Sequence, residues 1–75
     1  MPEWTFHNGT LYVEPGGYCL DQDFHGVHTI ALGAGAVVCY CNFFATQPIK
    51  IEQVGPSGPR AVITLCYFNE GAVHA

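Results

Sequence analysis

Two long runs of the chain are apolar at almost every position, without the alternation typical of a half-exposed strand. They are Ala36–Phe44 and Ala61–Phe68, and both are rich in β-branched and aromatic residues. Runs of this kind predict strands that are covered on both faces. A domain of 75 residues seldom has enough other material to cover two such strands. The pattern therefore predicts that one face of the sheet meets a partner surface.

Shorter segments predict further strands and the turns that join them. Asn8-Gly9 separates Trp4–His7 from Thr10–Val13, and this dipeptide favours the two positive φ angles of a type I′ hairpin turn. Val27–Leu32 predicts a third strand. Ile49–Val54 alternates apolar and polar side chains, as an edge strand with one wet face does, and its charged residues disfavour unwanted pairing.

The remaining patterns complete the prediction of the fold. Tyr18–Gly26 is polar and predicts the start of a short strand followed by an exposed loop. We find no repeat at a fixed period and no helical periodicity longer than a turn or two. The sequence thus predicts one all-β domain over residues 1–75, a small β-sandwich or barrel of about six short antiparallel strands joined by hairpins. Residues 72–75 are expected to fray.

Charge is scarce along the chain. Hydrophobic residues make up 49% of it and charged residues 11%, the formal net charge is −4, and Lys50 and Arg60 are the only basic residues. Binding to phosphates needs several clustered Lys or Arg side chains, so the composition argues against nucleic acid as a partner. The same scarcity argues against an anionic membrane surface. A charge-poor surface instead favours self-association.

The apolar segments do not have the form of targeting or membrane-spanning sequences. The first residues lack a basic segment followed by an apolar one, so no signal peptide is expected. The longest apolar run, Ile30–Cys41, contains Gly33 and Gly35 and falls short of the ~18–20 residues that a membrane helix needs. We therefore expect a protein that does not span a membrane and is cytoplasmic or associated with a virion.

One polar loop, Asp21–His28, holds residue types that bind metals. The spacing of His25 and His28 occurs in metal loops, and His7, His74 or the cysteines could contribute. A structural zinc site usually shows two tight pairs such as Cys-x-x-Cys, whereas here the Cys-x-Cys and His-x-x-His pairs lie on separate predicted elements. We expect no metal or cofactor. A small metal- or ligand-binding β-domain that uses this loop is the alternative function.

The chain has four cysteines, which are Cys19, Cys39, Cys41 and Cys66. Two disulfides would suit a secreted protein, but without a signal peptide free buried thiols are the better interpretation. Cys39 and Cys41 are expected to share one face of a strand, opposite Val38 and Tyr40. A catalytic Cys–His pair would also need a cleft, for which so small a domain has little room, so we expect no enzyme activity.

These patterns together predict a non-enzymatic structural or interaction module that works as a homo-oligomer or within a larger protein assembly. Obligate interfaces have the composition of a protein core, and association stabilises a short chain. The predicted chain is small, all-β, charge-poor and rich in turns. In this general character it resembles capsid decoration and minor virion proteins of viruses, including phages. The residues expected at the interface are Val38, Tyr40, Phe44, Val62, Cys66 and Phe68.

Overall fold

The computed structural model describes residues 3–70, and every regular element in this range is a β-strand. The prediction of an all-β domain is therefore confirmed. In the same range there is no helix with the length and apolar character needed to cross a membrane. The ten strands are β1 (Trp4–His7), β2 (Thr10–Val13), β3 (Tyr18–Leu20), β4 (Asp23–His25), β5 (Thr29–Leu32), β6 (Val37–Cys39), β7 (Asn42–Ala45), β8 (Lys50–Gln53), β9 (Val62–Thr64) and β10 (Tyr67–Glu70).

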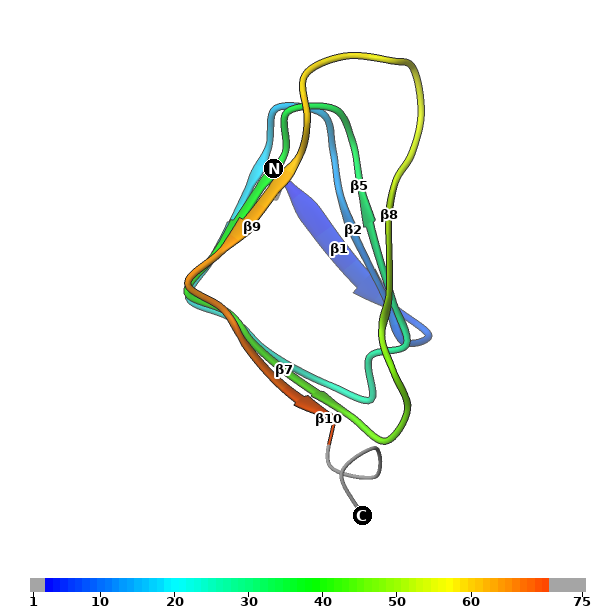
Figure 1. Ribbon diagram of the computed structural model, residues 1–75, viewed down its shortest axis with the longest axis vertical. Coiled ribbons are helices and arrows are strands. Elements are labelled where there is room, and N and C mark those ends of the chain that lie inside the picture. Colours follow the sequence, from blue (N-terminus) through cyan, green and yellow to red (C-terminus); the bar gives the residue numbers. More distant parts are fainter. Residues whose placement is uncertain (1–2, 71–75) are drawn as a thin grey trace.

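The strands from β2 onward form three stacked coils around a triangular interior (Figure 1). The first coil consists of β2, β3 and β4, the second of β5, β6 and β7, and the third of β8, β9 and β10. Each strand pairs in parallel with the strand at the same place in the next coil. The fold is thus a three-sided parallel β-solenoid, in which each coil is covered by its neighbours.

The structure differs from the predicted sandwich or barrel of about six antiparallel strands, because each long apolar run turns a corner. Ala36–Phe44 is divided into β6 and β7 at Tyr40, which has a φ of 56°. Ala61–Phe68 is divided into β9 and β10 at Leu65, which has a φ of 54°. Each run therefore supplies two short strands on two faces of the solenoid. For the first run, the coils before and after it provide the covering that the pattern had assigned to a partner surface, whereas the second run lies in the third coil and has a neighbouring coil on one side only among the described residues.

The predicted hairpin around Asn8-Gly9 is confirmed, and it closes one end of the solenoid. Asn8 and Gly9 have φ values of 49° and 79°, as a type I′ turn requires, and β1 pairs with β2 in antiparallel register. β1 crosses the N-terminal end of the triangular interior (Figure 1). There the rings of Trp4 and Phe6 pack on Phe24, with centroid separations of 5.2 and 5.1 Å.

Side chains that face the interior stack from coil to coil in ladders. Phe24, Phe43 and Phe68 occupy equivalent positions in β4, β7 and β10. Their rings are nearly parallel, with successive centroids 5.5 and 5.1 Å apart. The hydrophobic effect thus holds the coils together along the solenoid axis. Two further ladders are Leu11, Ile30 and Ile51, and Cys19, Val38 and Ile63.

A constant spacing in sequence relates the first two coils, although no repeat was expected. Thr10 pairs with Thr29, and Asp23 with Asn42, and the separation in sequence is the same for both pairs. The separation is greater between Asn42 and its partner Tyr67, because the connections from β7 to β8 and from β8 to β9 are both longer than those one coil earlier. This change of spacing hides the repeat. Residues 18–26 form β3 and β4 rather than one strand start and a loop, and the expected fraying of residues 72–75 lies outside the described range.

Candidate interaction surface

The two ends of the solenoid interior are covered to different extents. Leu11, in the first coil, is fully buried and pairs with Phe6 of β1. Ile51 occupies the last position of the same ladder, in the third coil, and is 50% exposed. The interior therefore ends uncovered at β8, within the described part of the chain. We call this surface the open end, and its inward-facing apolar side chains include Ile51, Ile63, Cys66 and Phe68.

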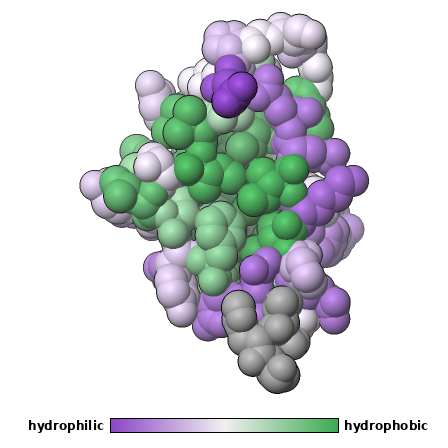
Figure 2. Space-filling model, viewed as in Figure 1, coloured by the Kyte–Doolittle hydropathy of each residue, from purple (hydrophilic) through white to green (hydrophobic). Residues whose placement is uncertain are grey.

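Apolar side chains gather over the middle of this end of the molecule, with polar side chains at its border (Figure 2). Leu65, at the corner between β9 and β10, is 64% exposed and enlarges the apolar area. Contiguous apolar surface with a polar border is typical of a site of protein association. The open end is therefore the candidate functional site.

The backbone at the open end also offers hydrogen-bonding groups. β8, β9 and β10 are each the last strand of their sheets among the described residues. The Lys50 amide donates to the carbonyl of His28 at 3.0 Å and so points toward β5. Because backbone groups alternate in direction along a strand, the N–H and C=O of Ile51 point away from β5. β8 is thus an edge strand, as predicted, with free groups that another strand could pair with.

Side-chain hydrogen bonds hold the connection between β8 and β9 in place. The Gln53 side chain occupies an inward position in the third coil. Its Oε1 accepts from the Ala61 amide at 2.8 Å, and its Nε2 donates to the Pro59 carbonyl at 3.3 Å. At the start of β8, Glu70 Oε2 accepts from the Ile49 amide at 2.8 Å. The third coil is therefore fixed by its own side chains, and it presents ordered strand edges to a partner.

The structure brings three of the six predicted interface residues together. Val62, Cys66 and Phe68 all belong to the third coil. Val62 is 46% exposed on the outer face of β9, whereas Cys66 and Phe68 are half-buried at the open end. Their assignment to an interface stays a prediction, and the structure places them at or beside the surface where apolar groups are exposed.

The other three predicted interface residues lie in the second coil and are apart from the open end. Tyr40 is 58% exposed at a corner. Phe44 is half-buried on the outer face of β7, where its ring stacks on His25 with a centroid separation of 4.5 Å. Val38 is fully buried in the interior, so in the folded chain it contacts other coils rather than an outer surface.

Sequence reasoning missed the two most exposed apolar groups of this site. Ile51 was assigned to the covered side of an edge strand, and Leu65 to the middle of a long strand. The spacing of the first two coils would not have found Ile51, because the separation between Leu11 and Ile30 leads from Ile30 to Ile49, whereas Ile30 pairs with Ile51. β8 is the last strand of its sheet among the described residues. The last coil of a solenoid lacks a neighbour to cover it.

The polar loop Asp21–His28 does not bring its possible metal ligands to one point. Asp23 Oδ1 accepts from Asn42 Nδ2 at 2.7 Å on the outer face of the solenoid. His25 stacks on Phe44, as described above. Within residues 3–70 there is no group of three His, Cys, Asp or Glu side chains that could hold a metal ion. His74 lies outside this range.

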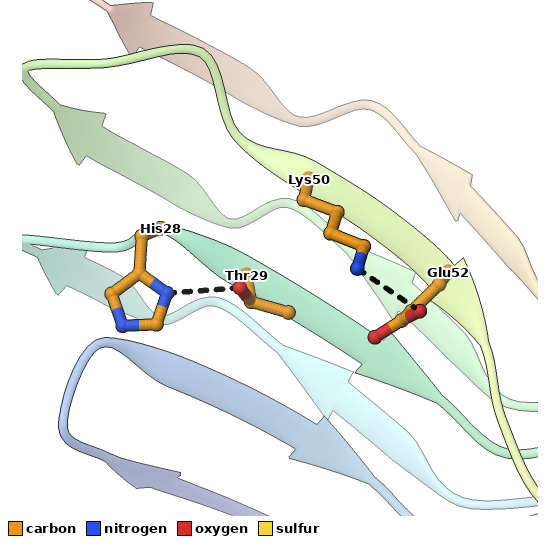
Figure 3. A network of polar contacts seen from close by, with 4 residues as sticks. All are labelled: His28, Thr29, Lys50 and Glu52. Atoms are coloured by element: carbon orange, nitrogen blue, oxygen red, sulfur yellow. Dashed lines mark hydrogen bonds and ion pairs between the residues drawn. The ribbon is translucent and has the colours of Figure 1, made fainter.

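His28 connects the N-terminal hairpin to the second coil. Its Nε2 lies 2.7 Å from the carbonyl oxygen of Asn8, and because a carbonyl only accepts, Nε2 donates this bond. Its Nδ1 lies 2.9 Å from the Thr29 hydroxyl (Figure 3). A backbone hydrogen bond joins the same two segments, because the His28 amide donates to the Gly9 carbonyl at 2.8 Å. The structure thus gives His28 a structural role.

The cysteines are free thiols, and their arrangement corrects the sequence prediction. Cys39 and Cys41 do not share a face, because the positive φ of Tyr40 turns the chain between them. Cys41 points inward, where its Sγ lies 3.9 Å from that of Cys19. Cys39 is half-buried on the outer face of β6. Val38, predicted to lie opposite both cysteines, shares the interior with Cys41.

Alkaline pH is expected to destabilise the fold through these buried thiols. Burial, followed by the neighbouring Cys41, raises the pKa of Cys19 above its ordinary value of 9.0. Below pH 9 the thiol is protonated in both folded and unfolded chains. Above pH 9 it ionises only in the unfolded chain, so stability falls by up to about 1.4 kcal/mol per pH unit for this thiol. Urea unfolding at pH 7 to 11, with reductant present, measures the loss.

The matched variant for this prediction is Cys19→Ala. It is expected to be less stable at pH 7, because it leaves a cavity, but to lose less stability between pH 9 and pH 11 than the wild type. An identical loss in both proteins would contradict the assignment to Cys19.

Comparison of the chain with protein families, with curated proteins and with solved structures finds no match. The geometry of the chain itself is therefore the basis on which a function is assigned. Exposed apolar ladder ends and unpaired strand edges are the two features that the open end offers to a partner.

Proposed function

We propose that this protein is a non-enzymatic structural module that associates with itself through its open end. The observation that carries the proposal is the contrast within one ladder, where Leu11 is fully buried and Ile51 is 50% exposed. A solenoid needs a polar cap on each terminal coil to remain a monomer in water. The described residues provide a hairpin cap at the N-terminal end only, and in this proposal a second copy of the chain covers the other end.

Burial of the open end stabilises the assembly. Full burial of an aliphatic or aromatic side chain is worth roughly 1.5–3 kcal/mol, and Ile51 has half of its surface still to bury. Ile63 and Phe68 add smaller amounts, because they are already half-buried. Pairing of strand edges adds hydrogen bonds to this apolar contribution. Since both copies contribute, association supports a domain that is small enough to be marginally stable alone.

A larger assembly is the wider setting of the proposal. The predicted role in a viral or phage particle, as a decoration or minor virion protein, stays a prediction, as does the cytoplasmic or virion-associated location. Binding of the purified protein to an isolated capsid or tail subunit would support the particle setting. Absence of such binding by a stable homo-oligomer would favour a free assembly of this chain.

Native mass spectrometry of the purified protein tests self-association. We expect species at whole multiples of the mass of the single chain when the protein is at micromolar concentration. A stable monomer under these conditions would overturn the proposed function.

Two apolar residues of similar exposure make a matched pair of variants. Ile51→Lys places a charge in the open end and is expected to shift the protein toward monomers. Leu20→Lys changes a residue that is 46% exposed on the outer face of the first coil, and the oligomer is expected to persist. Light scattering coupled to size exclusion measures both, and equal effects of the two variants would locate the interface elsewhere.

A further inference from the structure

We propose that two copies associate end to end about a two-fold axis at Ile51, with β8 of one copy pairing in antiparallel fashion with β8 of its partner. The inference rests on the proposed self-association and specifies its geometry. It follows from three features of the open end, which are the closed opposite end, the direction of the Ile51 backbone groups and the order of charges along β8.

The closed N-terminal end determines which surfaces meet. β1 crosses that end, and Trp4 and Phe6 cover Phe24 there. A further coil therefore cannot stack on the first coil, and head-to-tail growth of the solenoid is blocked. The open end of one copy must then meet the open end of another. Contact between identical surfaces generates a closed dimer with two-fold symmetry rather than a fibre.

The free backbone groups limit how the two β8 strands can pair. Two-fold symmetry makes the pair antiparallel, and residues whose N–H and C=O point outward face each other as hydrogen-bonded pairs. Ile51 is such a residue, because its neighbour Lys50 points toward β5. The permitted registers therefore differ by steps of two residues. In the central one, Ile51 faces the partner's Ile51.

Charge selects the central register. There Lys50 lies opposite the partner's Glu52, and Glu52 opposite the partner's Lys50, so two attractive pairs form. A shift of two residues in one direction places Lys50 opposite the partner's Lys50, and a shift in the other places Glu52 opposite the partner's Glu52. Like charges directly opposite each other destabilise a strand pair. The two charged residues of β8 thus disfavour the shifted registers and favour one.

The side chains required for these pairs are accessible. Lys50 and Glu52 lie on the outer face of β8, where Nζ and Oε1 are 3.7 Å apart (Figure 3). Their side chains are 70% and 41% exposed, so this ion pair within the chain contributes little. Breaking the Lys50–Glu52 pair within each chain to form pairs across the dimer therefore costs little free energy. In the dimer, each charged side chain then lies opposite one of opposite sign.

The same two-fold axis also covers the inward-facing side chains of the third coil with those of the partner. Ile51 continues the ladder of Leu11 and Ile30 into the partner. A two-fold rotation about an axis through the β8 face exchanges the other two faces of a three-sided solenoid, so β9 lies beside the partner's β10 in antiparallel orientation. Ile63 and Phe68, half-buried at the open end, then contact the partner's inward-facing residues. All three edges of the third coil are paired in this arrangement.

Two charge-reversal variants test the register of the β8 pair. Lys50→Glu and Glu52→Lys each place like charges opposite one another in a homodimer. We expect each to raise the dimer dissociation constant about tenfold at low salt, where surface charges are least screened. A mixture of the two variants restores attraction at both cross-dimer pairs, although the neighbouring charges within each chain still repel. We therefore expect heterodimers to form in preference to either homodimer in native mass spectra.

The outcomes separate the geometry from the proposed function. A monomeric wild type overturns both. An oligomeric wild type whose two variants show no preference for heterodimers overturns the β8 pairing and leaves self-association standing. Ile51→Cys gives a second readout, because position 51 lies on the axis and should give an oxidised, disulfide-linked dimer. Ser57→Cys, in the exposed connection between β8 and β9, and the wild type with its native thiols are the controls. Equal cross-linking in all three proteins would overturn the axis.

Discussion

Phe43→Ala is expected to remove a large part of the protein's stability to unfolding. Phe43 is fully buried and lies between the rings of Phe24 and Phe68 in the central coil. Loss of a buried phenylalanine costs about 3–5 kcal/mol. A domain of this length has a total stability of roughly 4–11 kcal/mol, at about 0.05–0.15 kcal/mol per residue. Thermal and urea unfolding followed by circular dichroism measure the change.

The neighbouring residue provides the control for this variant. Phe44 is on the opposite face of β7, half-buried, with one ring contact to His25. Phe44→Ala is therefore expected to cost only about 1 kcal/mol, the order of one aromatic pair. If the two variants lost equal stability, the alternation of inward and outward residues along β7 would be wrong.

Gly9→Ala is expected to cost about 3 kcal/mol and to loosen the contact between the Asn8-Gly9 turn and the second coil. Gly9 has a φ of +79°, and a Cβ there would lie 2.7 Å from Nε2 of His28 and 2.9 Å from the Gly26 carbonyl oxygen. The histidine ring would have to move, which breaks its hydrogen bond to the Asn8 carbonyl. Left-handed strain of about 1–2 kcal/mol adds to the lost bond, worth about 1 kcal/mol. Urea unfolding gives the total.

Gly16→Ala separates the backbone strain from the loss of the His28 hydrogen bond. Gly16 has a φ of +71°, close to that of Gly9, but an added Cβ meets no atom within 4 Å. We expect this variant to lose only the backbone contribution, about 1–2 kcal/mol. Hydrogen exchange of the β1 and β2 amides should accelerate in Gly9→Ala and remain slow in Gly16→Ala. Similar exchange in both would show that His28 does not hold the hairpin.

Local signals in the sequence were sufficient for the elements that depend on adjacent residues. Asn8-Gly9 predicted the hairpin because a two-residue turn with two positive φ angles suits few other dipeptides. Ile49–Val54 predicted an edge strand because its charged residues alternate with apolar ones. The all-β class followed from β-branched and aromatic residues and from the lack of helical periodicity. Each of these signals acts over a short stretch of neighbouring residues.

The candidate site could be predicted only in part. Val62, Cys66 and Phe68 were chosen because their run is apolar on both faces, and they do lie in the terminal coil. Val38 was chosen for the same reason, yet it is fully buried, because the second coil has a neighbour on each side. The sequence pattern of apolar residues is the same in a central coil, which is covered on both sides, and in a terminal coil, which is covered on one side only. The exposure of Ile51 depends on the absence of a further coil among the described residues.

The sequence by itself determined that this chain forms short β-strands, an N-terminal hairpin and a charge-poor surface, because those properties depend on residue type and on near neighbours. Only the tertiary structure decided that Tyr40 and Leu65 turn corners, and that strands far apart in the sequence pair in parallel. A corner interrupts an apolar run without changing its composition. Whether a run is one long strand or two short ones is decided by the coils that cover it, and these come from distant parts of the chain.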